Sequence, residues 1–600
     1  MPRAFVAIVG LPLCFAQSPT TTPQQHDSIV VTGTYEPVPL QESDRDVIVL
    51  PVNAQRLLFG SIADVLKLDS SIDLRQRAPN NIQSDLAIRG GSFGETLVLL
   101  NGIRLNDAQS GHHDMDLPVP FDAITEMQVL RGSGSSQYGA DAMDGVLNII
   151  TRNPEAPELR LRSSVGNFGT NSEGGSLAFR AIGLDQQFAF TRDFSSGFMP
   201  DRDYRNLALA SITHATSRLG ATDVVLSNSD RAFGADQFYG NFDSWERTRG
   251  WFASARQELG RETEADFAYR RHTDLFVLFR EDPAYFTNRH IDESWDGALR
   301  RNQDLPHSAS LHYGAEVFSD SINSNNLGIH SRIYEAAYAA FDIRVLHRFS
   351  LTASAREDIY GSFNREFSPT LSGGVWLTSK LKLHASASHA FRLPTYTDLY
   401  YHDPANLGSP TLRPEHATEF EAGGDYYSTP NLRLAFTVFR RSDRDLIDYV
   451  RASDNDIYRA TNLEHIVFTG FEGRLAIARF HRGSIEIQYT GIHAERLDAS
   501  PVQSRYVFNF PVQSGLISWQ GAIGPWLVAR TRIGIVERYA SDAYGVWDAS
   551  VARSSGVIRP FLQLTNITST VYQEILGVVM PKLGIVGGIQ MQLPMPKSFR

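Results

Sequence analysis

Cysteine is almost absent from this sequence. Cys14 is the only cysteine among 600 residues, and it lies in a mostly apolar stretch, 4–16, that follows Pro2-Arg3. This pattern is typical of a secretory signal peptide, residues 1–16, with cleavage after Ala16. Leu13 is too bulky for a lipoprotein cleavage site, which needs a small residue there. Without Cys14 the mature chain has no disulfide to stabilise it.

Excess positive charge and long apolar runs are also missing. The chain has 56 Lys plus Arg against 67 Asp plus Glu, a formal net charge of −11, and no concentrated basic stripe. Nucleic acid is therefore not an expected partner. After Ala16 no 18 consecutive residues are apolar, which excludes a membrane-spanning helix. If the chain crosses a membrane, it does so without a spanning helix.

Short alternating runs extend from about Leu159 to Leu593. Ile485, Ile487 and Tyr489, for example, share one face, with polar residues between them. A period of two residues predicts antiparallel strands. The polar faces carry Glu, Gln, His and Arg, which suit a wet lumen better than a packed core. Long polar connections, such as 236–248 and 400–415, alternate with short ones, such as 379–380. This alternation is typical of outer-membrane barrels.

We therefore expect a closed transmembrane β-barrel over residues 158–593, because a sheet in lipid must pair all its backbone groups. Dividing this segment among about 22 antiparallel strands leaves roughly 20 residues for each strand and its connection, of which about 9 to 11 cross the membrane. Such a ring is an open hole unless something fills it.

Residues 44–154 differ from the barrel and are the candidate filler. Ser61 is expected to cap a short helix that continues to Lys67. Asn101-Gly102 predicts a type I′ hairpin turn, because both residues tolerate positive φ. The segments 127–132 and 145–151 are expected to be strands around a small-residue loop. The sequence thus predicts a compact N-terminal α+β domain.

Five motifs in this domain identify a family resemblance. They are Ile88-Arg89-Gly90, 99–104 (LLNGIR), 129–132 (VLRG), Tyr138-Gly139-Ala140 and 145–151 (GVLNIIT), with 391–401 (FRLPTYTDLYY) and 412–415 (LRPE) further along. In this order they resemble the TonB-dependent outer-membrane receptors. The resemblance covers nearly the whole mature chain. It implies a barrel of 22 strands with the N-terminal domain inside the lumen as a plug, a location in the bacterial outer membrane, and a monomer.

The resemblance also implies energy delivered by a TonB-type periplasmic partner. Within the N-terminal segment 17–43, residues 27–32 are similar to the TonB box, and Asp27, Ser28, Ile29, Val30, Val31 and Thr32 are the expected contacts. A short β-branched segment can add a strand to a partner's sheet edge. Alternatively, 29–31 is the first strand of the plug.

At the C-terminal end of the chain, Pro594 and Pro596 have no backbone N–H and cannot donate a hydrogen bond to a β-ladder. Either the last strand ends before a tail, 594–600, or Phe599 reaches an assembly receptor from that tail.

Chain length and the compact plug look most like the vitamin B12 (cobalamin) transporters of this family. Carried over by position, Gln76, Arg77, Ser92 and Ser110 are the expected ligand contacts. Arg77 departs from an expected Asn and could favour an anionic ferric siderophore instead. Active uptake of cobalamin is thus the leading hypothesis. A siderophore or haem receptor, or a surface-binding receptor without transport, are the alternatives. Catalytic groups at interpretable spacing are not found, so an enzyme is not expected.

Other clusters could contribute to a site. His112 and His113, in the run 112–116 (HHDMD), could contact a metal or metal complex, or the run could be a solvated loop. Aromatic residues could hold a flat ligand by stacking, or could be girdle aromatics; these are Tyr239, Trp245, Tyr396, Tyr400 and Tyr401. No cofactor is expected to be required. Calcium could bind in outer loops at 201–203 (DRD) and 454–456 (DND).

Overall fold

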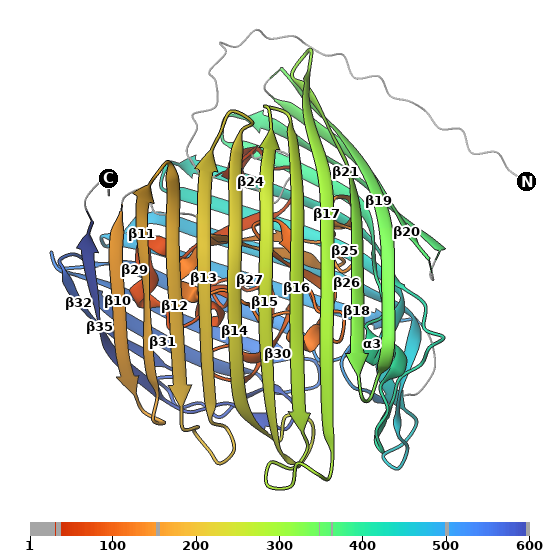
Figure 1. Cartoon of the computed structure of the whole chain (residues 1–600). Coiled ribbons are helices and arrows are strands. Elements are labelled where there is room, and N and C mark those ends of the chain that lie inside the picture. Colours follow the sequence, from red (N-terminus) through yellow and green to blue (C-terminus); the bar gives the residue numbers. More distant parts are fainter. Residues whose placement is uncertain are drawn as a thin grey trace, which may run out of the picture.

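The computed structural model describes residues 30–31, 38–151, 157–346, 348–361, 364–497 and 503–595. Its strands form a small N-terminal domain and a closed barrel that surrounds it (Figure 1). None of the helices in this part of the chain is long and apolar enough to cross a membrane. The predicted barrel with an internal plug is confirmed.

The plug is built on a five-stranded sheet with the strand order β3-β8-β9-β6-β7, beside a separate β4-β5 hairpin. The short elements β2 (Val38–Pro39) and η1 (Leu40–Glu42) precede it. Its own elements are β3 (Val47–Pro51), η2 (Asn53–Leu58), α1 (Ile62–Leu66), β4 (Ile72–Ala78), β5 (Ile82–Ile88), β6 (Thr96–Leu100), β7 (Ile103–Arg104), η3 (Gly111–His113), η4 (Phe121–Ala123), β8 (Ile124–Arg131), α2 (Ser135–Tyr138) and β9 (Gly145–Thr151).

Local signals in the plug act as expected. Ser61 caps α1 in a capping box with Asp64. Asn101 and Gly102 have φ values of 52° and 82°, so both adopt the positive φ that a type I′ turn requires. Strands β8 and β9 pair antiparallel around the small-residue loop, which also contains the short helix α2 that the sequence did not predict. The apolar side chains of both sheet faces are buried.

The barrel contains 22 full-length antiparallel strands. They are β10 (Glu158–Gly166), β11 (Asn171–Ala181), β12 (Leu184–Ser195), β13 (Tyr204–Thr216), β14 (Ala221–Asp236), β15 (Asp243–Leu259), β16 (Thr263–Val277), β17 (Thr287–Leu305), β18 (Ala309–Ser324), β19 (Gly328–Val345), β20 (Phe349–Tyr360), β21 (Asn364–Thr378), β22 (Leu381–Arg392), β24 (Glu415–Thr429), β25 (Leu432–Arg451), β26 (Tyr458–Phe480), β27 (Gly483–Arg496), β29 (Pro511–Ile523), β30 (Leu527–Arg538), β31 (Tyr544–Arg553), β32 (Ile558–Thr565) and β35 (Gly584–Pro594).

The ring closes where β10 pairs with β35, and Glu158 lies opposite Pro594. The last strand therefore includes Pro594, one residue further than expected. At a strand end the missing N–H removes at most one ladder bond. Residues 596–600, with Phe599, lie outside the described residues.

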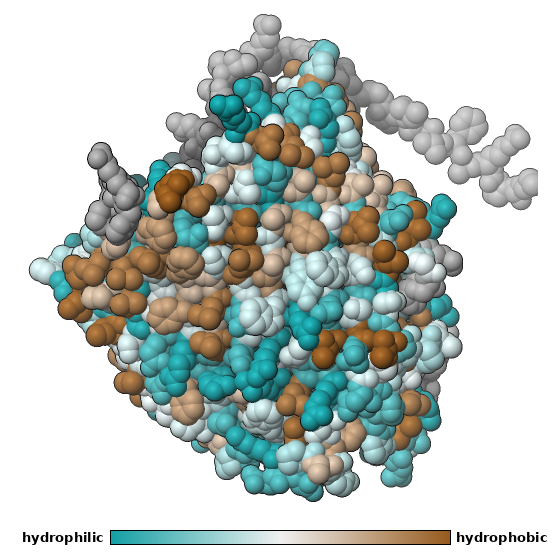
Figure 2. Space-filling view, in the orientation of Figure 1, coloured by the Kyte–Doolittle hydropathy of each residue, from teal (hydrophilic) through white to brown (hydrophobic). Residues whose placement is uncertain are grey.

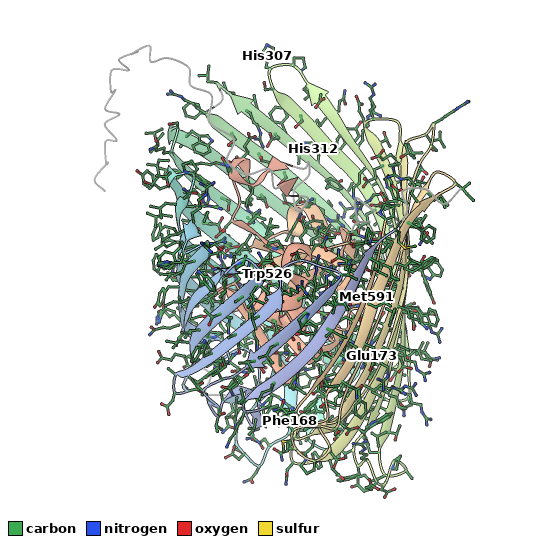
Figure 3. The ribbon with its side chains drawn as sticks, turned by 90° about the vertical axis from the view of Figure 1, so that its left-hand side faces the viewer. Phe168, Glu173, His307, His312, Trp526 and Met591 are labelled. Carbon is green, nitrogen blue, oxygen red and sulfur yellow. The ribbon has the colours of Figure 1, made fainter. Side chains whose placement is uncertain are left out.

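Connections at the two ends of the barrel differ in length. One end has tight turns such as 182–183 and 379–380, whereas the other carries the long connections 393–414, 497–510 and 566–583. We call the end with the long connections the outer end, and its connections the outer connections. The long connections contain α3 (Tyr396–Tyr400), β23 (Asn406–Leu407), β28 (Gln503–Ser504), β33 (Gln573–Ile575) and β34 (Val578–Val579). Figure 3 places His307, in a short turn, at one end and Phe168, in an outer connection, at the other. The prediction of a long connection over 236–248 was wrong, because β15 already begins at Asp243.

The barrel wall is apolar outside and polar inside. Exposed side chains on the outer face include Phe188, Leu209, Leu226, Trp251, Phe267, Trp295, Leu299 and Val317. Figure 2 shows such side chains spread over the wall, with hydrophilic ones gathered toward the lower end. On β16, Arg270, His272 and Asp274 point inward and are buried. A wall of this kind suits lipid outside and a polar lumen.

Buried ion pairs hold the plug in the lumen. Arg89, from the first plug motif, is fully buried and contacts three barrel glutamates: Glu472 at 2.8 Å, Glu421 at 2.5 Å and Glu419 at 3.3 Å. Arg131, from the third motif, lies 3.2 Å from Glu472. Because the partners are on different domains, these pairs fix the position of the plug against β24 and β26.

Candidate ligand site between the plug and the outer connections

Three segments of the plug contact the long connections of the barrel. Gln76 donates its backbone N–H to Glu574 of the 566–583 connection, at 2.7 Å. The carbonyl of Ala108 accepts from the Tyr396 N–H of the 393–414 connection, at 2.9 Å. The His112 ring lies 5.7 Å from that of Tyr506 in the 497–510 connection. The candidate ligand site is this junction, where the plug faces the outer connections.

Gln76 and Arg77 lie at the end of β4, next to the tip of the β4-β5 hairpin. Gln76 is buried and lines a cavity of about 180 Å³, together with Asn80 and Arg202. The Arg77 guanidinium pairs with Asp85 at 3.0 Å and faces the Tyr239 ring at 5.8 Å. Gln76 thus lines open space, whereas Arg77 is already neutralised by a carboxylate.

His112 belongs to an aromatic cluster that the sequence did not reveal. Its ring stacks on Phe93 at 4.0 Å, and Tyr506 packs edge-on against Phe93 at 4.9 Å. Asp85 lies 2.8 Å from His112 Nδ1. Burial lowers the pKa of His112, with Asp85 opposing that effect. Phe93 and Tyr506 carry no local signal of this role, because they are distant in sequence and meet only in the folded chain.

The two predicted serines are engaged within the plug. Ser92 Oγ donates to Glu95 at 2.6 Å. Ser110 caps η3 and accepts from the His112 N–H at 3.3 Å. Both side chains are buried. They support the loops that face the outer connections, and their role in ligand contact stays a prediction.

The aromatic residues that were predicted to stack on a ligand do not all lie in one group. Tyr239 donates to Glu246 at 2.9 Å and also pairs with Gln83, so it joins the plug hairpin to β15. Tyr400 stacks on His330 at 3.7 Å, on another side of the outer end. Trp245 lies between the inward-facing Ser244 and Glu246 of β15, so its side chain faces away from the lumen. The structure thus does not bring Trp245 to this group.

His113 turns away from His112 toward the barrel wall. Its Nδ1 lies 3.3 Å from Asp116 and its Nε2 lies 3.6 Å from Asp274. Although burial opposes it, these two carboxylates hold the pKa of His113 well above its usual value. His113, Asp114, Met115 and Asp116 are all buried. The alternative of a solvated loop is therefore wrong for these four residues.

Polar cavities continue from this region toward the short-turn end. A cavity of about 50 Å³ is lined by Asp107, Asp292 and Arg104. A second of about 630 Å³ begins at Arg104 and reaches the turn at Glu262. The larger lies between the plug and the strands β12 to β19, and the smaller between the plug and the strands β16 to β19, with Arg392 of β22. Arg104 lines both cavities and separates them.

The acidic groups expected to bind calcium are engaged with arginines. Asp201 and Asp203 both pair with Arg280, at 2.9 and 2.5 Å. Asp454 pairs with Arg451 at 2.6 Å. Calcium binding at these positions stays a prediction.

Only part of the expected TonB box falls within the described residues. Val30–Val31 form β1, which pairs antiparallel with Val38–Pro39. Asp27, Ser28, Ile29 and Thr32 lie outside the described residues. The alternative of a first plug strand is not favoured, because the pair forms a two-stranded sheet separate from the plug sheet.

Comparison with known proteins agrees with this architecture. The family model described as "TonB dependent receptor-like, beta-barrel" matches residues 158–563, and the "TonB-dependent Receptor Plug Domain" matches residues 45–146. The chain is 25% identical to the vitamin B12 transporter BtuB of Vibrio vulnificus over 77% of each chain. It is 23% identical to the vitamin B12 transporter BtuB of Photobacterium profundum, over 70% of this chain and 71% of the other.

Solved structures share the fold at lower identity. The siderophore receptor PirA from Acinetobacter baumannii superposes with a TM-score of 0.75 at 14% identity, covering 91% of this chain and 98% of the other. The FrpB iron transporter from Neisseria meningitidis superposes with a TM-score of 0.75 at 13% identity, covering 92% and 100%. With both family models matched in order, the chain belongs to the TonB-dependent receptors of the outer membrane, a family of transporters and receptors.

Proposed function

We propose that this TonB-dependent transporter takes up cobalamin across the outer membrane. The observation that carries the proposal is its similarity to vitamin B12 transporters over about three quarters of the chain, at 23 to 25% identity. The siderophore receptors and iron transporters among the solved structures are 13 to 17% identical and support only the fold. The barrel acts as a monomer, and its apolar outer face contacts lipid.

Gln76 supports this proposal through its position. It lines the cavity of about 180 Å³ beneath the 566–583 connection. Ligand pockets for drug-sized molecules are about 300 to 1,000 Å³, so a corrinoid needs more room. The 566–583 connection must therefore move outward on binding, which breaks the hydrogen bond between the Gln76 N–H and Glu574.

A ferric siderophore or haem is the second candidate ligand. The sequence suggested it because the positive charge of Arg77 could bind an anionic siderophore. In the structure that guanidinium pairs with Asp85 and is buried. A group already neutralised in this way offers little to an anionic chelate, because binding would first have to break the buried pair. The charge argument for an anionic ligand is thereby weakened.

Energy coupling would act on residues 27–32. A two-residue pairing such as Val30–Val31 with Val38–Pro39 is short enough to be exchanged for a strand of the periplasmic partner. Tension on this segment would then displace the plug at less than the cost of global unfolding. The polar cavities along β12 to β19 would become the route of the ligand.

Ligand identity is tested by binding of cyanocobalamin, haem and a ferric siderophore to the detergent-solubilised protein. We expect cyanocobalamin alone to bind tightly. Gln76→Ala should weaken its binding by about 1 to 2 kcal/mol, the value of one lost hydrogen bond. Gln137→Ala is the matched control, since Gln137 lines the cavity near the short turns. Binding of the siderophore or haem instead of cyanocobalamin would refute the assignment.

Coupling is tested separately in cells. Deletion of residues 27–32 should abolish uptake of labelled cobalamin while surface binding stays normal. Retained uptake would contradict coupling through this segment. Normal binding with no uptake even in the wild-type protein would favour a surface receptor without transport.

A further inference from the structure

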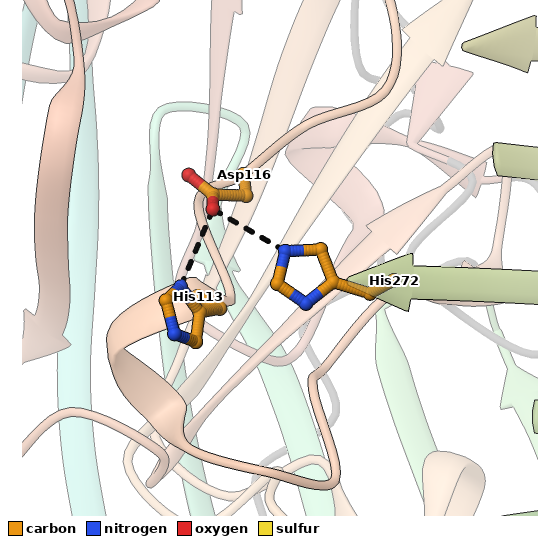
Figure 4. Close-up of side chains that lie close together, drawn as sticks. All are labelled: His113, Asp116 and His272. Atoms are coloured by element: carbon orange, nitrogen blue, oxygen red, sulfur yellow. Dashed lines mark hydrogen bonds and ion pairs between the residues drawn. The ribbon is translucent and has the colours of Figure 1, made fainter. Parts of the chain in front are cut away.

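Two histidines and an aspartate meet where the plug contacts β16. His113 and Asp116 come from the plug segment at η3, and His272 points inward from β16. Asp116 Oδ2 lies 3.3 Å from His113 Nδ1 and 3.5 Å from His272 Nε2 (Figure 4). The residues His113, Asp116 and His272 are 4%, 7% and 1% exposed. The uptake proposal does not use this cluster.

The separations also match the spacing of metal ligands. Charge-assisted N–H···O bonds are about 2.7 to 2.9 Å long. A tetrahedral ion with ligands at about 2.0 to 2.2 Å instead holds its donor atoms roughly 3.3 to 3.5 Å apart. In addition, His272 Nε2 is buried and makes no hydrogen bond of ordinary geometry. A buried ring nitrogen of this kind, aimed at a carboxylate oxygen, is available to a metal ion.

Carboxylates lie near the second ring nitrogen of both histidines. Asp107 Oδ2 is 2.9 Å from His272 Nδ1, the ring nitrogen opposite the cluster. Asp274 is 3.6 Å from His113 Nε2 and is itself held by Gln109 at 2.8 Å. Metal-ligating histidines almost always have such a partner on the other ring nitrogen. Each histidine thus has a carboxylate beside its second ring nitrogen, at a distance or angle outside that of a hydrogen bond.

Negative charge exceeds positive charge around the cluster. Among the described residues, the carboxyl groups there are Asp107, Asp114, Asp116, Glu246, Asp274 and Asp292, and the basic groups facing them are Arg231, Arg270 and His113. Neither carboxylate oxygen of Asp292 makes a hydrogen bond, although the residue is 2% exposed. Buried carboxylates are stabilised by cationic partners, and a divalent ion would add positive charge to this group.

We propose that His113, Asp116 and His272 bind one divalent transition-metal ion of the zinc type. Two imidazoles and a carboxylate suit zinc, cobalt and nickel, whereas calcium and magnesium take oxygen ligands. Arg231 occupies Asp116 Oδ1 at 3.0 Å, which leaves Oδ2 for the ion. The ion cross-links the plug to the barrel wall, since its ligands come from both. This site is independent of the nutrient transported.

The test uses the full-length processed protein in detergent, stripped of metal by a chelator. Zn²⁺ is titrated by calorimetry and Co²⁺ by visible absorption. We expect one ion per chain, a four-coordinate Co²⁺ spectrum, and a higher Tm with Zn²⁺, because the ion binds the native state. His113→Gln and His272→Gln should each lower Zn²⁺ affinity at least tenfold. Asp116→Asn should do the same.

His384→Gln is the matched control. His384 is also a buried barrel histidine near a carboxylate, with Nε2 3.8 Å from Asp425, but it is not part of this cluster. Its replacement should leave Zn²⁺ binding unchanged. Absence of tight Zn²⁺ binding by the wild-type protein would overturn the proposal. So would unchanged affinity in the cluster variants, an equal loss in the control, or a six-coordinate, all-oxygen Co²⁺ spectrum. The wild-type spectrum alone decides the matter if a cluster variant fails to fold.

Discussion

Replacing Arg89 by methionine should loosen the plug within the barrel. The guanidinium is fully buried and contacts Glu421, Glu419 and Glu472. In Arg89→Met, Arg131 still pairs with Glu472, but Glu419 and Glu421 each lose their only ion-pair partner among the described residues. Leaving a buried charge unpaired costs about 3 to 5 kcal/mol. We expect the plug to lose stability by that amount.

Urea unfolding of the plug measures this loss. Cys14 is the only native cysteine and lies in the expected signal peptide, so Gln137→Cys provides a single labelling site on the plug. A dye there reports plug unfolding while the barrel stays folded in the micelle. With an m-value of about 2 kcal/mol/M, the midpoint should fall by roughly 1.5 to 2.5 M.

Two further variants sharpen the result. Arg192→Met removes an exposed pair with Glu173, in which both side chains are 45% exposed, and should change stability by at most about 1 kcal/mol. Adding Glu421→Gln to Arg89→Met removes the unpaired charge and should recover part of the loss. A loss below about 1 kcal/mol in Arg89→Met, or no recovery in the double variant, would refute the reasoning.

Three other substitutions can be followed in the same assay. Gly132→Ala should destabilise the plug by at least about 1 to 2 kcal/mol, because φ is 75° and a Cβ would lie 2.5 Å from Glu419 Oε2; an unchanged midpoint would contradict this. Leu100→Ala should cost about 2 to 5 kcal/mol, since Leu100 is fully buried, and a smaller loss would indicate that the core collapses around the cavity. Burial alone would raise the pKa of Asp85, but Arg77 and His112 hold it well below its usual value. The ionised Asp85 carboxylate therefore stabilises the plug above about pH 4, the pKa of an unfolded aspartate. This stabilisation is lost as the pH falls through the lower pKa that Asp85 has in the folded protein. Asp85→Asn should accordingly destabilise most at pH 7 and progressively less as the pH falls below about 4, and a penalty independent of pH would refute that cause.

Much of the fold was predictable because its signals are local. Alternation of apolar and polar residues sets which side of a strand meets lipid, and it was visible in runs such as 485–489. Asn101-Gly102 and Ser61 act through their own backbone conformation and neighbouring N–H groups. Such features need no knowledge of distant residues, so the turn and the helix start were confirmed.

Strand ends and side-chain partners were less predictable. The polar segment 236–248 resembles a connection, yet β15 begins at Asp243 because its residues pair with β14. That pairing turns Trp245 outward, away from the expected site. Phe93 and Tyr506 meet at 4.9 Å although they are more than 400 residues apart. No pattern around either residue predicts the contact.

Sequence by itself determined the family, the two-domain architecture and the closed ring, because periodicity, turn residues and motif order are properties of short segments. Tertiary structure alone decided which charges face one another. Arg77 is neutralised by Asp85, Arg89 enters a group of barrel glutamates, and His113 meets His272 across the domain boundary. Each of these depends on the angular position of the plug in the barrel. That position is set by long-range burial and pairing, which no single segment of the chain encodes.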